Sequence, residues 1–196
     1  MVHRPTRVAP GPAAGVGWHV RSARAADADA WHALQRVIYA EGVAFVGDGP
    51  PTAAALTARI RGLEAAVAYV ALAVADGGEP VGWVEVQQLA ARRLMHVAWL
   101  TLAVAPGWRR RGVATALLVA ARAWAEGRRL RKLQLHVRAG NAGAIALYRR
   151  HGYRREGVLR DQVALAADGR AGFEDEWILC LDLTVEARDL TVEAST

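Results

Sequence analysis

The chain has 196 residues, of which 53% are hydrophobic, so it is long enough for one folded domain and too apolar to be disordered throughout. No apolar run reaches the roughly 18 residues that a membrane helix needs, and the N-terminus lacks the apolar core of a signal peptide. We therefore expect no membrane as partner. The formal net charge is +6, but the sequence contains no nucleic-acid-binding motif, so we expect no specific nucleic acid as partner either.

The N-terminal third of the chain predicts one strand and two helices. A short strand is expected over 18–23, and the helix that follows it ends near Ala40 with Asp27 or Asp29 as its cap. A loop rich in Gly and Pro then leads to a second helix over 52–66.

Three strands are predicted next, over 69–75, 81–88 and 95–104. The first two are separated by residues 76–80, Asp-Gly-Gly-Glu-Pro, a sequence typical of a hairpin turn. We therefore expect these two strands to pair as neighbours in an antiparallel arrangement.

After Pro106 the apolar residues follow the period of a helix. This apolar stripe consists of Val113, Leu117, Ala121 and Trp124. Gly127 is expected to end the helix, and strict alternation predicts a strand over 133–138. Asn141 can cap a further helix that Gly152 ends.

The last predicted elements are strands over 153–165 and 173–183, which flank a turn at Asp168. The element order β-α-α-β-β-β-α-β-α-β-β predicts an α/β (α+β) fold, a mixed sheet with helices on its faces. We expect one folded domain over 18–183, with tails over 1–17 and 184–196.

The C-terminal tail repeats the pentapeptide Leu-Thr-Val-Glu-Ala, which begins at Leu183 and again at Leu190. A frayed terminus and a strand that pairs with a second subunit both fit this repeat, so a homodimer is one expectation. Cys180 has no partner for an internal disulfide bond, which fits the cytoplasm that we expect for this chain. No spacing of Cys, His or carboxylates suggests a metal site.

The segment 102–114, Leu-Ala-Val-Ala-Pro-Gly-Trp-Arg-Arg-Arg-Gly-Val-Ala, predicts a strand that passes through a basic turn into a helix. The first amides of a helix have no internal partner and the helix dipole adds positive charge, so this turn can bind phosphate. Gly112 allows close backbone approach, and Ala114 is too small to block it. The candidate cationic and hydroxyl side chains are Arg109, Arg110, Arg111 and Thr115. An ordinary charged helix start is the alternative.

Two motifs resemble those of the GNAT superfamily of N-acetyltransferases. Arg109-x-x-Gly112-x-Ala114 is similar to the family signature R/Q-x-x-G-x-G/A, in the matching strand–turn–helix context. The segment 141–153, Asn-Ala-Gly-Ala-Ile-Ala-Leu-Tyr-Arg-Arg-His-Gly-Tyr, resembles the family pattern N-x-x-A-x-x-L-Y-x-x-x-G-F, with Tyr153 in place of Phe. The two motifs stand in the family order, and the resemblance covers roughly residues 18–183, most strongly 96–157.

The resemblance implies a single GNAT-like domain with a twisted, mixed, mostly antiparallel sheet of about seven strands, splayed central strands and helices on both faces. It also implies acetyl-CoA as cosubstrate, with its pantetheine arm bonded like an added strand to the backbone near Leu102 and Val104. The implied cofactor-binding residues are Leu102, Val104, Arg109, Arg110, Arg111, Gly112, Val113, Ala114, Thr115, Asn141, Ala144 and Tyr148.

The reaction implied by the resemblance is direct attack of a primary amine on the thioester carbonyl in a ternary complex. An alkyl ammonium group has a pKa near ~10.4, so the amine must lose a proton before it attacks. The leaving thiolate must gain a proton. Tyr148 matches the family tyrosine that lies near the coenzyme sulfur and protonates this thiolate. A tyrosine that only packs against the sheet is the alternative.

The general base is left open among three residues. Related protein N-terminal acetyltransferases carry a glutamate on the strand before the second motif, where this chain has His136. Strand alternation directs His136 away from its apolar neighbours, and an imidazole titrates near ~6.5, which suits a base. A structural histidine, with a water chain as base, is the alternative. Glu85 is the second candidate, with an exposed edge-strand charge as its alternative, and His96 is the third.

We expect the acceptor to contact residues 31–66 and 159–177. The expected acceptor is a protein N-terminus, an amino acid or a small amine. Asp48 is a candidate partner for a cationic amine. The acidic cluster of Glu174, Asp175 and Glu176 either attracts such an acceptor or balances nearby arginines. A catalytically silent acyl-CoA-binding module and a basic nucleic-acid-associated protein are the alternative functions.

Overall fold

The computed structural model describes residues 17–42, 45, 47, 49–63, 67–165, 169 and 171–184. Residues 1–16 and 185–196 of the predicted tails lie outside this part, as do Asp48 and Asp168 and all of the pentapeptide repeats beyond Thr184. Within the described ranges, no helix combines the length and the apolar character needed to cross a membrane.

The described residues contain seven strands and four α-helices, which follow one another in the order expected from the sequence. The strands are β1 Trp18–Ser22, β2 Ala68–Ala75, β3 Pro80–Gln88, β4 Val97–Val104, β5 Lys132–Arg138, β6 Arg154–Ala164 and β7 Phe173–Asp182. The α-helices are α1 Ala28–Tyr39, α2 Ala53–Arg61, α3 Val113–Gly127 and α4 Ala142–Arg150. Short 3-10 helices cover Ala25–Asp27, Arg92–Leu94 and Pro106–Trp108.

The strands are hydrogen-bonded in the order β1-β2-β3-β4-β5-β7-β6. The pairs β1–β2, β5–β7 and β6–β7 are antiparallel, and β4–β5 is parallel. The expected mixed sheet of seven strands is therefore confirmed. The parallel β4–β5 ladder has only three residue pairs, from Val97–Lys132 to Trp99–Gln134, as expected for central strands that splay apart.

The chain divides into two compact units. The first contains Met1–Val86 and Thr101–Ala121, and the second contains Gln87–Leu100 and Arg122–Thr196. Strand β4 and helix α3 each contribute residues to both units.

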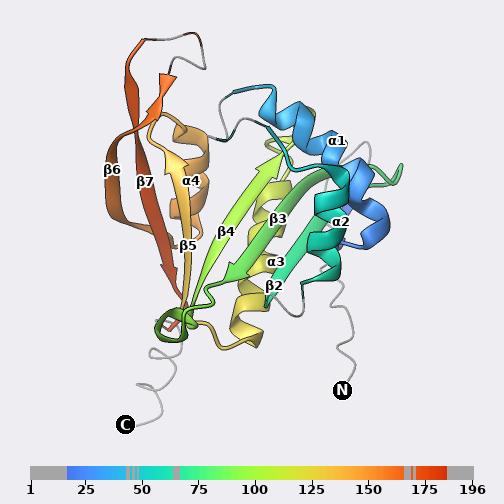
Figure 1. Cartoon of the computed structure of the whole chain (residues 1–196), viewed down its shortest axis with the longest axis horizontal. Coiled ribbons are helices and arrows are strands. Elements are labelled where there is room, and N and C mark those ends of the chain that lie inside the picture. The colour runs from blue at the N-terminus through green and yellow to red at the C-terminus, as the bar shows by residue number, and fades with distance from the viewer. Residues whose placement is uncertain are drawn as a thin grey trace. The chain divides into compact units, whose positions relative to one another are not determined.

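In the first unit, helices cover both faces of the sheet. Trp83 on β3 packs edge-to-face on Trp31 of α1, with ring centroids 6.4 Å apart, and both rings are buried. The neighbouring Gly82 points to the opposite face, where a Cβ atom would lie 3.2 Å from Leu117 of α3. Figure 1 shows α1 and α2 together over β2 and β3. Apolar side chains of α1, α2 and these strands form one continuous buried core.

In the second unit, α4 covers one face of the strands β5, β7 and β6. Arg149 of α4 lies over the ring of Trp177 on β7, 5.8 Å from its centroid. Val137 on β5 is paired with Trp177 in the register, so both side chains face α4. The adjacent His136 is paired with Ile178 and faces away from this helix. Alternation along β5 thus separates its buried apolar residues from the polar residues of the site.

Most element boundaries lie within one residue of the sequence-based expectations, and three of the differences are informative. The strand expected from 95 begins at Val97, because a 3-10 helix over Arg92–Leu94 is followed by a turn at residues 95–96. Helix α2 ends at Arg61, and residues 64–66 lie outside the described part. Gly127 is the last residue of α3 instead of following it, and the left-handed residue after the helix is Arg129, at φ +56°.

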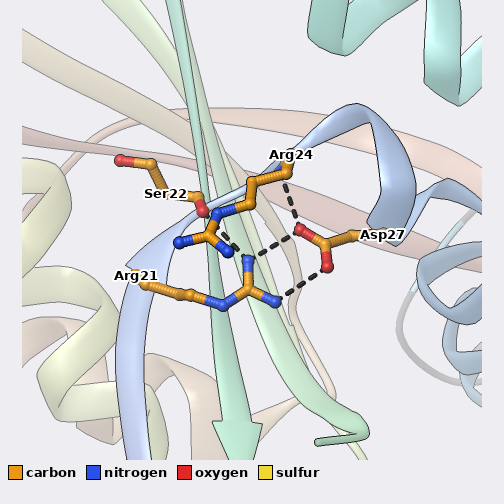
Figure 2. A network of polar contacts seen from close by, with 4 residues as sticks. All are labelled: Arg21, Ser22, Arg24 and Asp27. Carbon is orange, nitrogen blue, oxygen red and sulfur yellow. Dashed lines mark hydrogen bonds and ion pairs between the residues drawn. The ribbon is translucent and has the colours of Figure 1, made fainter.

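Asp27 is the N-cap residue of α1, as one of the two expected candidates, but its side chain forms no capping hydrogen bond because it makes other contacts. Its carboxylate accepts two hydrogen bonds of 2.7 Å from the Arg21 guanidinium and one of 2.7 Å from the Arg24 backbone amide (Figure 2). No side chain caps the first turn of α1, where Asp29 is exposed. Asp27 therefore fastens β1 to the start of the helical segment. The bond from Arg21 is the main cause of the lowered pKa of Asp27.

Asp27→Asn is expected to lower the free energy of unfolding at pH 7 by about 1 kcal/mol, because the charge-assisted pair with Arg21 is lost. For a chain of this size the melting temperature falls by about 2–4 °C. Because the folded state lowers the pKa of Asp27, this stabilisation is present above the ordinary aspartate pKa and is lost as the pH falls through the lowered value. Thermal unfolding at several pH values tests this, with Asp29→Asn as control. A difference in melting temperature between Asp27→Asn and wild type that grows as the pH falls would contradict this expectation.

Candidate active site

The turn between β4 and α3 presents backbone amides without acceptors. Gly112 has φ +81° and directly precedes α3, and its carbonyl accepts a 3.0 Å bond from the Ala116 amide. The amides of residues 111–115 donate to no acceptor within the described part of the chain. A Cβ atom at Gly112 would meet only Trp18, 3.9 Å away. This turn therefore has the free donors and the open backbone that a phosphate group requires.

The three arginines of this turn have different surroundings. Arg109 donates from Nε to the Val104 carbonyl at 3.0 Å, and its guanidinium forms a two-bond ion pair with Glu41, of which one bond is 3.0 Å. Arg111 lies over the ring of Trp108, 5.2 Å from its centroid, and Arg110 has φ +63°. Neither Arg110 nor Arg111 forms an ion pair with a described residue. Arg109 thus links the end of β4 to Glu41, which lies two residues beyond the end of α1. Arg110 and Arg111 remain available to bind an anion.

The other cofactor-binding residues predicted near this turn lie on the strand before it and at the start of the helix after it. Leu102 is half-buried on β4, and Val104 is buried, with its carbonyl already bonded to Arg109. At the start of α3, Val113 is buried, Ala114 is half-buried and Thr115 is exposed.

The start of α4 is fixed by side-chain contacts. Asn141 caps the helix, because its Oδ1 accepts a 3.2 Å bond from the Ala144 amide. The turn before it is held by Glu174, whose carboxylate accepts from Arg138 at 2.9 Å and 2.8 Å and from the Gly140 amide. Asn141 and Ala144 are therefore bonded to one another, as the capping motif predicts.

Tyr148 lies on α4 and is 6% exposed. Its ring packs on Tyr153 with centroids 5.6 Å apart. Burial raises the pKa of Tyr148, so its phenol stays protonated at neutral pH. The hydroxyl forms no hydrogen bond with any residue that the structure describes. It is therefore a proton donor without an acceptor among the described residues.

Glu85 is not an exposed charge on an edge strand, because β3 lies between β2 and β4. Its carboxylate accepts bonds of 3.1 Å and 2.9 Å from Arg59 of α2, and its side chain is 14% exposed. Burial raises the pKa of Glu85, whereas the Arg59 guanidinium acts in the opposite direction. Both oxygens of Glu85 are thus already bonded to a cation.

His136 lies on β5 between aromatic and acidic side chains. Its Nδ1 is 3.1 Å from Oε2 of Glu176 on β7, and its ring meets Trp99 of β4 edge-on, with centroids 4.7 Å apart. Its Nε2 is buried and has no hydrogen-bond partner among the described residues. His96, the third candidate base, is exposed and precedes β4.

The acidic cluster is used within the protein. Glu174 pairs with Arg138, Asp175 with Arg160 at 3.1 Å, and Glu176 with His136. This agrees with the interpretation that these carboxylates balance nearby basic groups. Sequence reasoning missed Glu41 and Arg59 as partners of Arg109 and Glu85, and it did not connect Glu176 with His136. The partners are 68, 26 and 40 residues apart, so no local sequence signal joins them.

Residues 31–153 match the acetyltransferase (GNAT) family. The fold is similar to that of a GNAT-family acetyltransferase from Streptococcus pneumoniae, with TM-score 0.76 and 24% identity over 83% of this chain and 98% of that one. It is also similar to that of a ribosomal-protein-alanine N-acetyltransferase from Brucella melitensis, with TM-score 0.73 and 21% identity over 83% of this chain and 98% of that one. A third similar structure is a phosphinothricin acetyltransferase from Sinorhizobium meliloti in complex with AcCoA, with TM-score 0.75 and 19% identity over 84% of this chain and 88% of that one. Among curated proteins, none has a significant sequence match.

Proposed function

The chain belongs to the acetyltransferase (GNAT) family, and from this premise we propose that it transfers the acetyl group of acetyl-CoA to a primary amine by direct attack in a ternary complex. The observation that carries the proposal is the turn before α3, with its open glycine and its amides that lack described acceptors. Acetyl-CoA supplies the activated thioester, and the side chains of the protein bind, orient and move protons.

In this proposal the amides of residues 111–115 bind the diphosphate, and Arg110 and Arg111 neutralise its charge. Arg109 has a different role from the one its place in the motif suggests. Because Glu41 and the Val104 carbonyl already hold its guanidinium, Arg109 keeps the turn in the shape that exposes its amides. The capped start of α4, at Asn141 and Ala144, fixes the helix that carries Tyr148.

Tyr148 is proposed as the general acid. Its buried phenol stays protonated at neutral pH and has no described hydrogen-bond acceptor, so its proton is available to the departing thiolate. The proton moves from the phenol oxygen to the sulfur as the carbon–sulfur bond breaks. The packing of the ring on Tyr153 holds the hydroxyl in position.

His136 is proposed as the general base in preference to Glu85. Both oxygens of Glu85 are bonded to Arg59, so proton uptake there would disrupt an ion pair. His136 has a free Nε2, which can take the proton from the attacking amine. The side chain of His96 is exposed and forms no hydrogen bond or ion pair with a described residue.

The test of the function is thiol release from acetyl-CoA across a panel of amines. The panel includes peptides with an N-terminal alanine, because one similar structure is named a ribosomal-protein-alanine N-acetyltransferase. It also includes phosphinothricin, after which a second similar structure is named. We expect amine-dependent turnover with at least one member. Coenzyme A binding without turnover across the panel would instead support a silent acyl-CoA-binding module. Strongly salt-dependent RNA or DNA binding that coenzyme A does not affect would support a nucleic-acid-associated protein.

A further inference from the structure

Three strands of the second unit place Trp99, His136 and Glu176 close together. Strand β5 pairs with β4 at Trp99–Gln134 and with β7 at Arg138–Glu176. The side chain of His136 reaches Glu176 on one side and the Trp99 ring on the other. All of these contacts form on the face of β5 that points away from α4. The imidazole is thus held from two neighbouring strands.

The contact with Glu176 determines which ring nitrogen carries the proton. A carboxylate only accepts hydrogen bonds, so Nδ1 of His136 must carry the hydrogen that joins the two groups. In a neutral imidazole the other nitrogen then has a lone pair. This nitrogen, Nε2, is the buried atom without a described partner. A buried acceptor without a partner is energetically unfavourable, and an N–H of a bound amine would remove this penalty.

Two further charged residues on this face, Arg138 and Glu174, are already paired with one another. Arg138 follows His136 by two residues on β5, and its guanidinium is bonded to Glu174. Trp99, the contact from β4, carries no charge. Glu176 is 8% exposed, so its bond to His136 is shielded from solvent. Glu176 is therefore the one described carboxylate in contact with the imidazole, and its position is determined by the β5–β7 register.

We propose that Glu176 is a positioning residue for catalysis. It holds His136 as the Nδ1–H tautomer and directs the Nε2 lone pair toward the attacking amine. This inference rests on the proposed function, in which His136 accepts the proton of the amine. The proton moves from the amine nitrogen to Nε2, and the resulting imidazolium is stabilised by the Glu176 carboxylate at Nδ1. No proton transfer to Glu176 is required.

Glu176→Gln is expected to lower kcat about 10- to 100-fold, with KM for acetyl-CoA within about twofold of wild type, because only the proton-transfer step is affected. In the His136→Ala background the same substitution is expected to have no further effect, because Glu176 acts through His136. A matched control is Asp175→Asn, which removes the neighbouring carboxylate, bonded to Arg160 and to the Asp161 amide. This control is expected to keep wild-type kcat.

A second measurement does not depend on turnover. Histidine ring 15N NMR, with the His136 signals assigned by their loss in His136→Ala, is expected to find the proton on Nδ1 in wild type. In Glu176→Gln it is expected to be redistributed between the two nitrogens. A proton on Nε2 in the wild-type neutral ring would overturn the inference. An equal fold-loss of kcat on Glu176→Gln substitution in the wild-type and His136→Ala backgrounds would overturn it as well. If turnover needs His136 but not Glu176, only this inference fails. If wild type has no turnover with any amine, the proposed function fails and the inference with it.

Discussion

Tyr148→Phe is expected to lower kcat by about 10²- to 10³-fold, the usual contribution of a general acid, with little change in KM for acetyl-CoA. The substitution removes only the phenol oxygen, and the ring keeps its buried position against Tyr153. Since the hydroxyl bonds to no described residue, its removal leaves no protein group without a partner. Any large loss of rate then reflects the missing proton for the thiolate. Single-turnover thiol release measures this step apart from product release.

The matched control for Tyr148→Phe is Tyr153→Phe. Tyr153 is 3% exposed, lies next to Tyr148, and stands where the family motif has phenylalanine. The variant also loses one buried hydroxyl, but we expect its kcat to stay within about twofold of wild type, because such a hydroxyl supplies no proton to the reaction. Equal losses in both variants would indicate a packing defect. An unchanged rate in Tyr148→Phe would remove Tyr148 from the mechanism.

Gly112→Val is expected to weaken coenzyme A binding by about 100-fold. At φ +81° a β-branched residue is strained, at a cost of about 1–3 kcal/mol, so the turn shifts and its amides move apart. In addition, the new side chain occupies the space where the backbone must approach the diphosphate. The free protein has room for the Cβ atom, since only Trp18 comes within 4 Å, at 3.9 Å. We therefore expect the fold to persist while affinity is lost, as measured by calorimetric titration with coenzyme A.

Gly107→Val provides the control in the same loop. A Cβ atom at Gly107 would meet nothing within 4 Å, and its φ is not in the left-handed region. Its affinity for coenzyme A is expected to stay within about threefold of wild type, because the turn before α3 is not strained. If both valine variants bind coenzyme A as wild type does, the diphosphate does not bind at the turn and the proposed function loses its main support.

Much of the fold was predictable because its signals are local. The helix caps at Thr52 and Asn141 and the positive φ at Gly112 depend on residues within one turn of the chain. Apolar alternation placed Leu133, Leu135 and Val137 on the buried face of β5, and all three are buried. Asp27 is an exception: it is the N-cap residue of α1, but its carboxylate bonds to Arg21 instead of to the first turn of the helix. A tertiary contact outweighed a local preference there.

The element order, the family and the turn that we propose binds the cofactor were predictable without coordinates, because helix caps, periodicity and motifs are encoded by residues close together in the chain. The partners of the charged groups became known from the folded structure alone: Glu41 for Arg109, Arg59 for Glu85 and Glu176 for His136. These pairs depend on strand register and helix placement, which bring together residues far apart in sequence. The same contacts decide which nitrogen of His136 is free, because the position of Glu176 on β7 follows from its pairing with β5.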